Sequence, residues 1–308
     1  ARGITGDVST ETEAEAAELT LPEDVTIYYG EVAEEDILVL PEYEKAYASR
    51  DLLVQMERKI SEEEARELAG VYGAELVGFI SLTGTCQWRF AKGMDQNRLF
   101  EIQEEVEGFD GVSCISLNYM SGEQPASWLD NVIDWFTGIS SEEKKWGFNK
   151  SYGEFAWENQ NWMKEPVSVA VLDFGFQKHG KLHYQLCEDG AGDDCEHGTH
   201  VMGIIGAERK NKKEICGVYP KAANRLYAYD VSKTSTMKKI SFIVDAIARN
   251  IKILNLSMGA DKLAVDTYRK YYTDPEGLSA QEYVRKKVPD LSQESELLSR
   301  MLRGLIDE

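Results

Sequence analysis

Two residues of this sequence could together activate a nucleophile: Asp173 and His197. Asp173 ends the largely apolar run 167–172, and His197 opens the glycine-containing motif 197–203. A carboxylate at the carboxyl end of a buried strand can accept the ring N–H of an imidazole, which leaves the other ring nitrogen as a general base. Asp before His is also the chain order of one known Asp-His-Ser triad. We therefore predict that Asp173 orients His197 as two thirds of a serine-protease triad.

The serine of such a triad does not follow these two residues. No Gly-Thr-Ser segment occurs after His197 in the 308 residues. Gly84-Thr85-Cys86 mimics such a segment, but it lies upstream, in a different predicted unit, and we reject it as the nucleophile. We expect the serine to lie beyond this chain, and the chain by itself to be proteolytically inert.

Two other functions fit parts of the same motifs. Asp173-Phe174-Gly175 is the magnesium motif of protein kinases, but a kinase also needs His-Arg-Asp and a Gly-x-Gly-x-x-Gly loop, which the sequence lacks. His197 and His200, three residues apart, could instead ligate a metal, with Cys195 as the best third ligand. Further carboxylates nearby are Asp193, Asp194 and Glu196. We predict no catalytic metal, and the metal site stays open as an alternative.

In these motifs the sequence resembles the subtilisin-like serine proteases, or subtilases. The motif at 197–203 (His-Gly-Thr-His-Val-Met-Gly) is the most specific match. Residues 217–222 (Gly-Val-Tyr-Pro-Lys-Ala) resemble the family's Gly-Val-Ala-Pro segment, and residues 255–259 (Asn-Leu-Ser-Met-Gly) resemble its Asn-Met-Ser-Leu-Gly segment. Residues 51–120 look like the inhibitory propeptide of secreted members. The resemblance covers about residues 51–308.

The resemblance implies roles for individual residues. Asp173 and His197 are the catalytic acid and base, while His200, one helical turn on, is expected to face packing. Ser257, Met258 and Gly259 would pair with the substrate backbone and wall its main specificity pocket. Phe174 departs from the family, which has Ser or Thr beside the acid. No cofactor is required for the chemistry. Structural calcium can accompany the family, although residues 208–213 are basic where a calcium loop would fall.

Hydrophobic periodicity divides the chain into four parts. Residues 1–44 carry 13 acidic side chains and one Arg, which predicts a disordered acidic leader. Residues 45–120 follow the order β-α-β-β-α-β, with helix starts at a Ser61–Glu64 capping box and at Asp95, which predicts a ferredoxin-like α+β domain. The family resemblance implies that this domain is the propeptide. Residues 121–164 are a connector with the expected maturation site. Residues 165–308 alternate strands and helices and end in a helix at about 293–306, which predicts a doubly wound, parallel-sheet α/β domain. The family resemblance implies that it is the first part of a domain of subtilisin-like fold.

Composition limits the partners and the compartment. The formal net charge of −20 argues against nucleic acid and anionic membranes, which attract clustered Lys and Arg. No run of 18 apolar residues is present, so we predict no membrane span. The family resemblance implies a secreted or cell-surface protein. Among the five cysteines, Cys187 and Cys195 bracket the loop before His197 and could form a disulfide there.

These observations lead to one principal function and one alternative. We predict the zymogen of a serine endopeptidase, which takes polypeptide substrates and has its own propeptide as an intramolecular inhibitor. The alternative is a catalytically silent protein that keeps the subtilisin fold for binding, with the N-terminal domain as inhibitor or folding chaperone. Phe174 and the absent serine favour the alternative, and the Asp173–His197 pair favours the enzyme.

Overall fold

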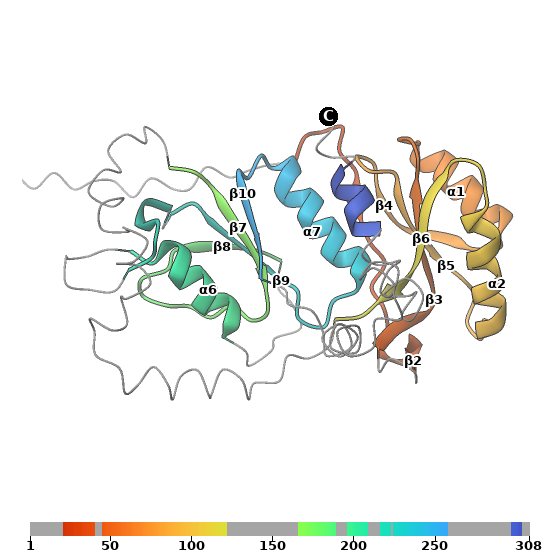
Figure 1. The fold of residues 1–308 in the computed structure, drawn as a ribbon, viewed down its shortest axis with the longest axis horizontal. Helices are drawn as coiled ribbons and strands as arrows, with labels where there is room; N and C mark the ends of the chain where they lie inside the picture. The colour runs from red at the N-terminus through yellow and green to blue at the C-terminus, as the bar shows by residue number, and fades with distance from the viewer. Residues whose placement is uncertain are drawn as a thin grey trace, which may run out of the picture.

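Two β-sheets and the helices that pack on their faces make up the fold in the computed structural model (Figure 1). An antiparallel sheet belongs to the N-terminal part of the chain, and a parallel sheet to the C-terminal part. The structure describes residues 21–40, 45–121, 166–188, 196–208, 216–222, 224–257 and 297–303.

The N-terminal unit follows the predicted order β-α-β-β-α-β. Its strands pair antiparallel, and β3 lies between β5 and β6, while β4 pairs with the other edge of β5. Helices α1 and α2 contact the sheet through β4 and β6, and a core around Trp88 and Leu99 fills the space between helices and sheet. The elements are β3 (Lys45–Met56), α1 (Glu62–Val71), β4 (Glu75–Ile80), β5 (Thr85–Arg89), α2 (Gln96–Glu107) and β6 (Val112–Tyr119).

Side-chain caps fix where the two helices of this unit begin. Ser61 accepts a hydrogen bond from Glu64 N–H, and the Glu64 carboxylate accepts one from Ser61 N–H, which completes the predicted capping box. Asp95 caps α2 by accepting from Arg98 N–H. The helix starts predicted from the sequence are therefore confirmed at both places.

The predicted disorder of the acidic leader is wrong for its described part, residues 21–40. There β1 (Ile27–Tyr28) pairs with β4, and β2 (Ile37–Leu40) pairs with β3. Both segments are apolar or β-branched, so they can extend a sheet although the residues around them are acidic. Residues 1–20, 41–44 and 122–165, and with them nearly all of the predicted connector, lie outside the described residues.

The C-terminal unit is a parallel sheet covered by helices on both faces, as predicted. Its strands are β7 (Val169–Asp173), β8 (Tyr184–Glu188), β9 (Leu226–Asp230) and β10 (Ile253–Leu256), in the order β10-β7-β9-β8. Val169 and Val171 pack with α6 (His197–Gly206), whereas Ala170 and Leu172 pack with α7 (Thr236–Ala248). This alternation explains why β7 is buried throughout and reads as a continuous apolar run.

One element of this unit was missed in the sequence, and another is described only in part. Strand β8 was not predicted, because Tyr184–Glu188 mixes polar and apolar residues in a short segment between loops. The final helix, predicted over 293–306, is present among the described residues at 297–303.

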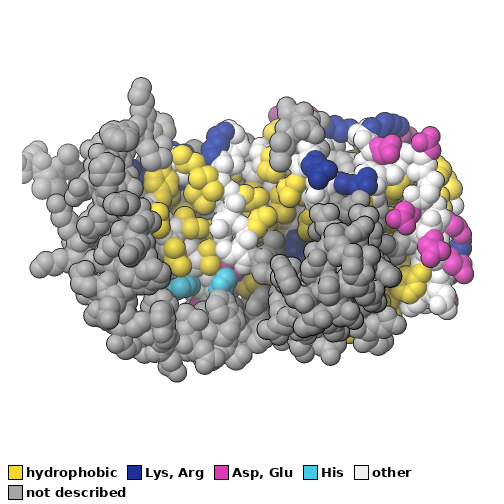
Figure 2. Space-filling model, in the orientation of Figure 1, with side chains coloured by type: hydrophobic (Ala, Val, Ile, Leu, Met, Phe, Trp, Pro, Cys, Tyr) yellow, Lys and Arg dark blue, Asp and Glu magenta, His cyan; other side chains and the backbone are white. Residues whose placement is uncertain are grey.

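Helix α7 joins the two units, since it lies between the two sheets (Figure 1). One cluster of buried side chains contains Leu53, Ile80 and Cys114 from the antiparallel sheet together with Phe242 and Ile243 of α7. Tyr29, just after β1, meets Phe242 edge-on, with ring centroids 6.3 Å apart. The Nζ of Lys238 lies 2.9 Å from a carboxylate oxygen of Glu31. In Figure 2, charged side chains gather over the N-terminal unit and hydrophobic ones over the parallel sheet and its helices.

A buried carboxylate organises the antiparallel sheet on the side that faces α7. Asp51 in β3 is fully buried and accepts two hydrogen bonds of 2.7 Å from the guanidinium of Arg89. Gln87 donates a third to Asp51, at 2.7 Å, and Asn118 donates a fourth, at 3.3 Å. Asn118 in turn accepts the N–H of Met237, in the first turn of α7, at 3.1 Å. The charge on Asp51 thus helps to hold the residue that docks β6 against α7.

We expect Asp51→Ala to lower the free energy of unfolding by about 3 kcal/mol, because Arg89 would keep a largely desolvated charge without its partner. The double variant Asp51→Leu/Arg89→Met removes both charges and should lose clearly less. Urea denaturation followed by circular dichroism measures both. A double variant as unstable as the sum of its single changes would contradict a coupled pair.

Candidate active site

The predicted acid and base lie together at the carboxyl end of the parallel sheet. Asp173 is the last residue of β7 and is fully buried, and His197 is the first residue of α6. Their side chains meet with 2.5 Å between Asp173 Oδ1 and His197 Nδ1. Because a carboxylate only accepts hydrogen bonds, Nδ1 is the nitrogen that carries the proton in this contact. The imidazole is about four-fifths buried, with 18% of the side chain exposed.

Backbone hydrogen bonds fix the start of α6 to the loop that follows Asp173. The N–H of Gly198 donates to the carbonyl of Phe174 at 2.8 Å, and the N–H of Thr199 donates to the carbonyl of Gly175 at 3.2 Å. These are donors that a first helical turn leaves without helical partners. The Thr199 hydroxyl also accepts the N–H of Gln177 at 2.6 Å. The position of His197 is therefore fixed by the backbone hydrogen bonds at the start of α6 as well as by the contact of its side chain.

Two glycines make this close approach between loop and helix possible. Gly175 has φ +67°, a left-handed conformation that glycine adopts without strain. A Cβ on Gly198 would lie 2.9 Å from the carbonyl oxygen of Gly175 and 2.7 Å from the ring of Phe176. Gly206 likewise packs against Leu226, but a Cβ on Gly203 would meet no heavy atom within 4 Å. The motif glycine that brings His197 to Asp173 is therefore Gly198.

The environment of Asp173 is strongly asymmetric. Burial raises the pKa of Asp173, and the hydrogen bonds from His197 and from Phe174 N–H, the latter 2.7 Å long, act against this shift. The nearby carboxylate of Asp230 raises the pKa further. Among the described residues, no donor lies within hydrogen-bond distance of the buried Oδ2 of Asp173, and the neighbouring Phe174 side chain packs in the hydrophobic core. The described part of the chain thus supplies no other donor in place of the hydroxyl that the sequence lacks at position 174.

The other residues predicted for the site are only partly described. Ser257 follows β10, and its hydroxyl lies 2.6 Å from Asn255 Nδ2, while Met258 and Gly259 lie outside the described residues. His200 is exposed on α6, so the expectation that it faces packing is wrong. Residues 217–219 hold the far end of α6, since Val218 N–H and Tyr219 N–H donate to the carbonyls of Ile204 and Ile205, each at 2.8 Å.

A second segment near the site was missed in the sequence. After β6, Met120 and Ser235 form an antiparallel bridge, and Ser121 N–H donates to the carbonyl of Thr234 at 2.8 Å. The Thr236 hydroxyl donates to the carbonyl of Tyr119 at 3.2 Å. Residues 232–236 (Ser-Lys-Thr-Ser-Thr) therefore offer an edge along which an extended chain can lie. The run of small polar residues between a strand and a helix is the sequence feature from which this edge could have been predicted.

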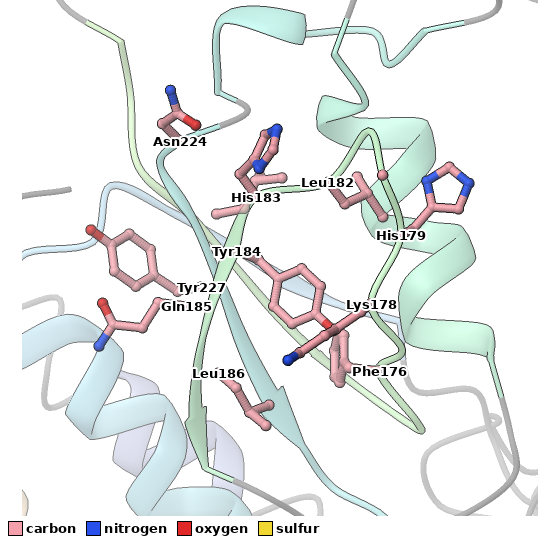
Figure 3. A pocket seen from close by; sticks show the side chains of 12 residues that line it. Phe176, Lys178, His179, Leu182, His183, Tyr184, Gln185, Leu186, Asn224 and Tyr227 are labelled. Atoms are coloured by element: carbon pink, nitrogen blue, oxygen red, sulfur yellow. The ribbon is translucent and has the colours of Figure 1, made fainter. Parts of the chain in front are cut away.

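A separate hollow lies beside the outer strand β8 (Figure 3). Its volume is about 780 Å³, and neither Asp173 nor His197 lines it. The side chains around it include Phe176, His179, His183, Tyr184 and Tyr227. The hollow is therefore distinct from the acid–base pair, although Phe176 comes only three residues after Asp173.

Within the described residues there is neither a cluster of metal-ligating side chains nor a helix that could span a membrane. No group of three or more His, Cys, Asp or Glu side chains gathers there as a metal site would need. Asp193, Asp194 and Cys195, the other members of the metal alternative, lie outside these residues. The predicted disulfide between Cys187 and Cys195 also falls partly outside the described residues, because Cys195 lies there. None of the helices in the described ranges is long and apolar enough to cross a membrane.

Comparisons with known proteins find similarity to one protein family in the C-terminal unit. The sequence model of the Subtilase family matches residues 164–298. The minor extracellular protease Epr of Bacillus subtilis (strain 168) is 30% identical over 149 residues, which are 44% of this chain and 22% of that protein. The thermophilic serine proteinase of Bacillus sp. (strain AK1) is 25% identical over 237 residues, which are 70% of this chain and 53% of that protein. This second match extends to residues before position 164.

Two solved structures are also similar. The epidermin leader peptide processing serine protease EpiP of Staphylococcus aureus has a TM-score of 0.45 and 17% identity, over 78% of this chain and 59% of that chain. Fervidolysin of Fervidobacterium pennivorans, a keratinolytic enzyme related to subtilisin, has a TM-score of 0.42 and 15% identity, over 86% of this chain and 42% of that chain. The chain spans less than two thirds of each of these four proteins.

The glycines of α6 provide a matched pair of substitutions. We expect Gly198→Ala to destabilise the protein by about 1–3 kcal/mol, because the added methyl group collides with a backbone carbonyl. Gly203→Ala, in the same helix, should be neutral or stabilise by about 0.5–1 kcal/mol, because alanine favours the helix and the space is open. Urea denaturation compares the two variants. Equal effects would show that close packing at Gly198 does not set the position of His197.

Proposed function

We propose, from the match of the Subtilase family model to residues 164–298, that the chain is a subtilase and carries the acid and base of a serine endopeptidase. Asp173 is the acid, and His197 is the base. The nucleophilic serine lies beyond residue 308 in this proposal. The observation that carries the proposal is the contact of 2.5 Å between Asp173 Oδ1 and His197 Nδ1.

The chemistry of the proposed site follows from this contact. With Nδ1 engaged by Asp173, Nε2 of His197 takes the proton of the serine hydroxyl as that oxygen attacks the peptide carbonyl. The imidazolium that forms is stabilised by the carboxylate of Asp173. The same proton then passes from Nε2 to the leaving amine, which completes acylation, and a water molecule repeats the cycle to release the acid.

The substrate of the proposed enzyme is a polypeptide held in an extended conformation. Ser257, Met258 and Gly259 are proposed to pair with its backbone on one side. The polar edge 232–236 is proposed as a second side, since it already accepts the extended residues Tyr119–Ser121. Backbone pairing of this kind binds peptides of varied sequence, because main-chain groups supply the hydrogen bonds.

We further propose that residues 45–120 are a ferredoxin-like propeptide, so that the chain is part of a zymogen. Three observations support this assignment. The strand order β6-β3-β5-β4 is antiparallel with both helices in contact with it, the unit docks on α7, and its last strand leads directly to the edge 232–236. The match to a serine proteinase also extends into this part of the chain. We propose secretion as well, in line with the extracellular relative.

The alternative function, a catalytically silent binding protein, is favoured by one observation. Oδ2 of Asp173 is buried with no hydrogen-bond donor from the described residues, next to a phenylalanine whose side chain cannot donate. A carboxylate held in this way is less fully stabilised in its ionised form than one with both oxygens engaged. Activity measurements on the full-length protein decide between the two functions.

In the full-length protein, we expect His197→Ala and Asp173→Asn each to lower kcat by about 10⁴-fold, as in other triads, because the base is lost or held in the wrong tautomer. His200→Ala should have a far smaller effect, since its side chain is exposed on α6. Turnover of a peptide substrate is the measurement, with circular dichroism as the folding control. An inactive His200→Ala beside an active His197→Ala would overturn the triad and favour the metal site.

The propeptide assignment predicts where the zymogen is cut. We expect the mature N-terminus between Tyr119 and Asn131, because β6 delivers the residues after it toward the catalytic pair. N-terminal sequencing of the purified full-length protein gives the position, and the His197→Ala variant should stay uncut. A mature protein that begins before Val112 or after Val167 would refute the assignment.

A further inference from the structure

A second buried carboxylate lies directly beside the catalytic acid. Asp230 ends β9 as Asp173 ends β7, and the two residues are paired in the register of these parallel strands. Asp230 is 4% exposed. A buried carboxylate needs hydrogen-bond donors to remain in the folded state at low cost, so its partners indicate its role.

The partners of Asp230 belong to the two loops that flank the site. Its Oδ1 accepts the N–H of Ser232 at 2.9 Å and the hydroxyl of Ser232 at 2.5 Å. The same oxygen lies 3.4 Å from the N–H of Gly175, in the loop whose carbonyls hold the start of α6. Asp230 therefore connects the loop of the catalytic acid with the segment that leads to α7.

The turn built on Asp230 has a strained but well-bonded backbone. Lys233 has φ +51°, a conformation that is costly for a residue other than glycine. The Thr234 hydroxyl donates to the carbonyl of Val231 at 2.8 Å, and Val231 N–H donates to the carbonyl of Asp173 at 2.9 Å. A turn of this kind keeps its shape only when side-chain bonds such as those of Asp230 support it.

The turn presents the edge to which the chain after β6 is bound. The carbonyl of Thr234 accepts the N–H of Ser121 at 2.8 Å, and Ser235 bridges Met120 in antiparallel register. Asp230 bonds to Ser232, whereas the contacts with the bound chain are made by Thr234 and Ser235. Asp230 therefore does not touch a bound peptide and positions the edge through Ser232 and the turn.

We propose that Asp230 is the positioning residue of a peptide-binding edge at 232–236, holding this edge in register with Asp173 and His197. The proposal rests on the proposed function, in which the extended ligand is the propeptide segment 119–121 before maturation and a polypeptide substrate after it. Its expected signature is a loss of binding that grows with the length of the peptide lying along the edge.

The first test compares Asp230→Ala with Asp230→Asn in the full-length protein, on a long peptide and on a short amide too small to reach residues 232–236. Asp230→Ala should lower kcat/KM at least tenfold more for the long peptide than for the short amide, mainly through KM. Asp230→Asn should recover most of this difference, because an amide oxygen can still accept the N–H of Ser232. Asp245→Ala, which removes a half-buried carboxylate of α7 bonded to Arg249 and to the Tyr229 hydroxyl, is the matched control and should affect both substrates alike.

Equal losses for both substrates in Asp230→Ala, or no loss for either, would overturn the proposal. A wild-type protein that cleaves neither substrate would overturn the proposed function instead. In that case hydrogen exchange on residues 1–308 still tests Asp230, because Ser121 N–H is bonded to the edge. Asp230→Ala should speed exchange at Ser121 about tenfold or more, and Asp230→Asn and Asp245→Ala should not. Unchanged exchange in Asp230→Ala would refute the positioning role.

Discussion

The contact between Asp173 and His197 depends on one constraint: a carboxylate with no exposed surface must have a partner at the end of β7. The structure meets this constraint with the N-terminus of α6. The N–H groups of Gly198 and Thr199 bind the carbonyls of residues 174 and 175, so the imidazole reaches Asp173 as the helix docks. Helix, loop and acid are therefore one unit, in which the absence of a side chain at Gly198 matters as much as the imidazole.

The same end of the sheet also brings the two units of the chain together. Strands β7 and β9 end side by side in Asp173 and Asp230, and the segment after β9 meets the segment after β6. Helix α7 begins there, with its Met237 N–H bound by Asn118 of the antiparallel sheet. The buried charge of Asp51 orients Asn118. A chain of hydrogen bonds thus leads from the core of the N-terminal unit to the edge proposed for peptides.

The sequence predicted those parts of the structure that depend on local patterns. The apolar run of β7, the capping box at Ser61 and the glycine-containing start of α6 each have a periodic or motif-based signal, and each is observed. Strand β8 was missed, and so was the pairing of β1 with β4 and of β2 with β3. Short strands at a sheet edge take their stability from neighbours that are distant in sequence. Asp230 and Asp51 were missed for a related reason: the partners that give them a role, Ser232 apart, become neighbours only on folding.

The most direct measurement of the central claim is proton nuclear magnetic resonance of the imidazole N–H groups in residues 1–308. A short hydrogen bond from Nδ1 to a buried carboxylate strongly deshields its proton. The account predicts one such signal at low field, absent in His197→Ala, shifted upfield in Asp173→Asn and unchanged in His200→Ala. A spectrum without this signal, or a signal that persists in His197→Ala, would contradict the pairing of Asp173 with His197.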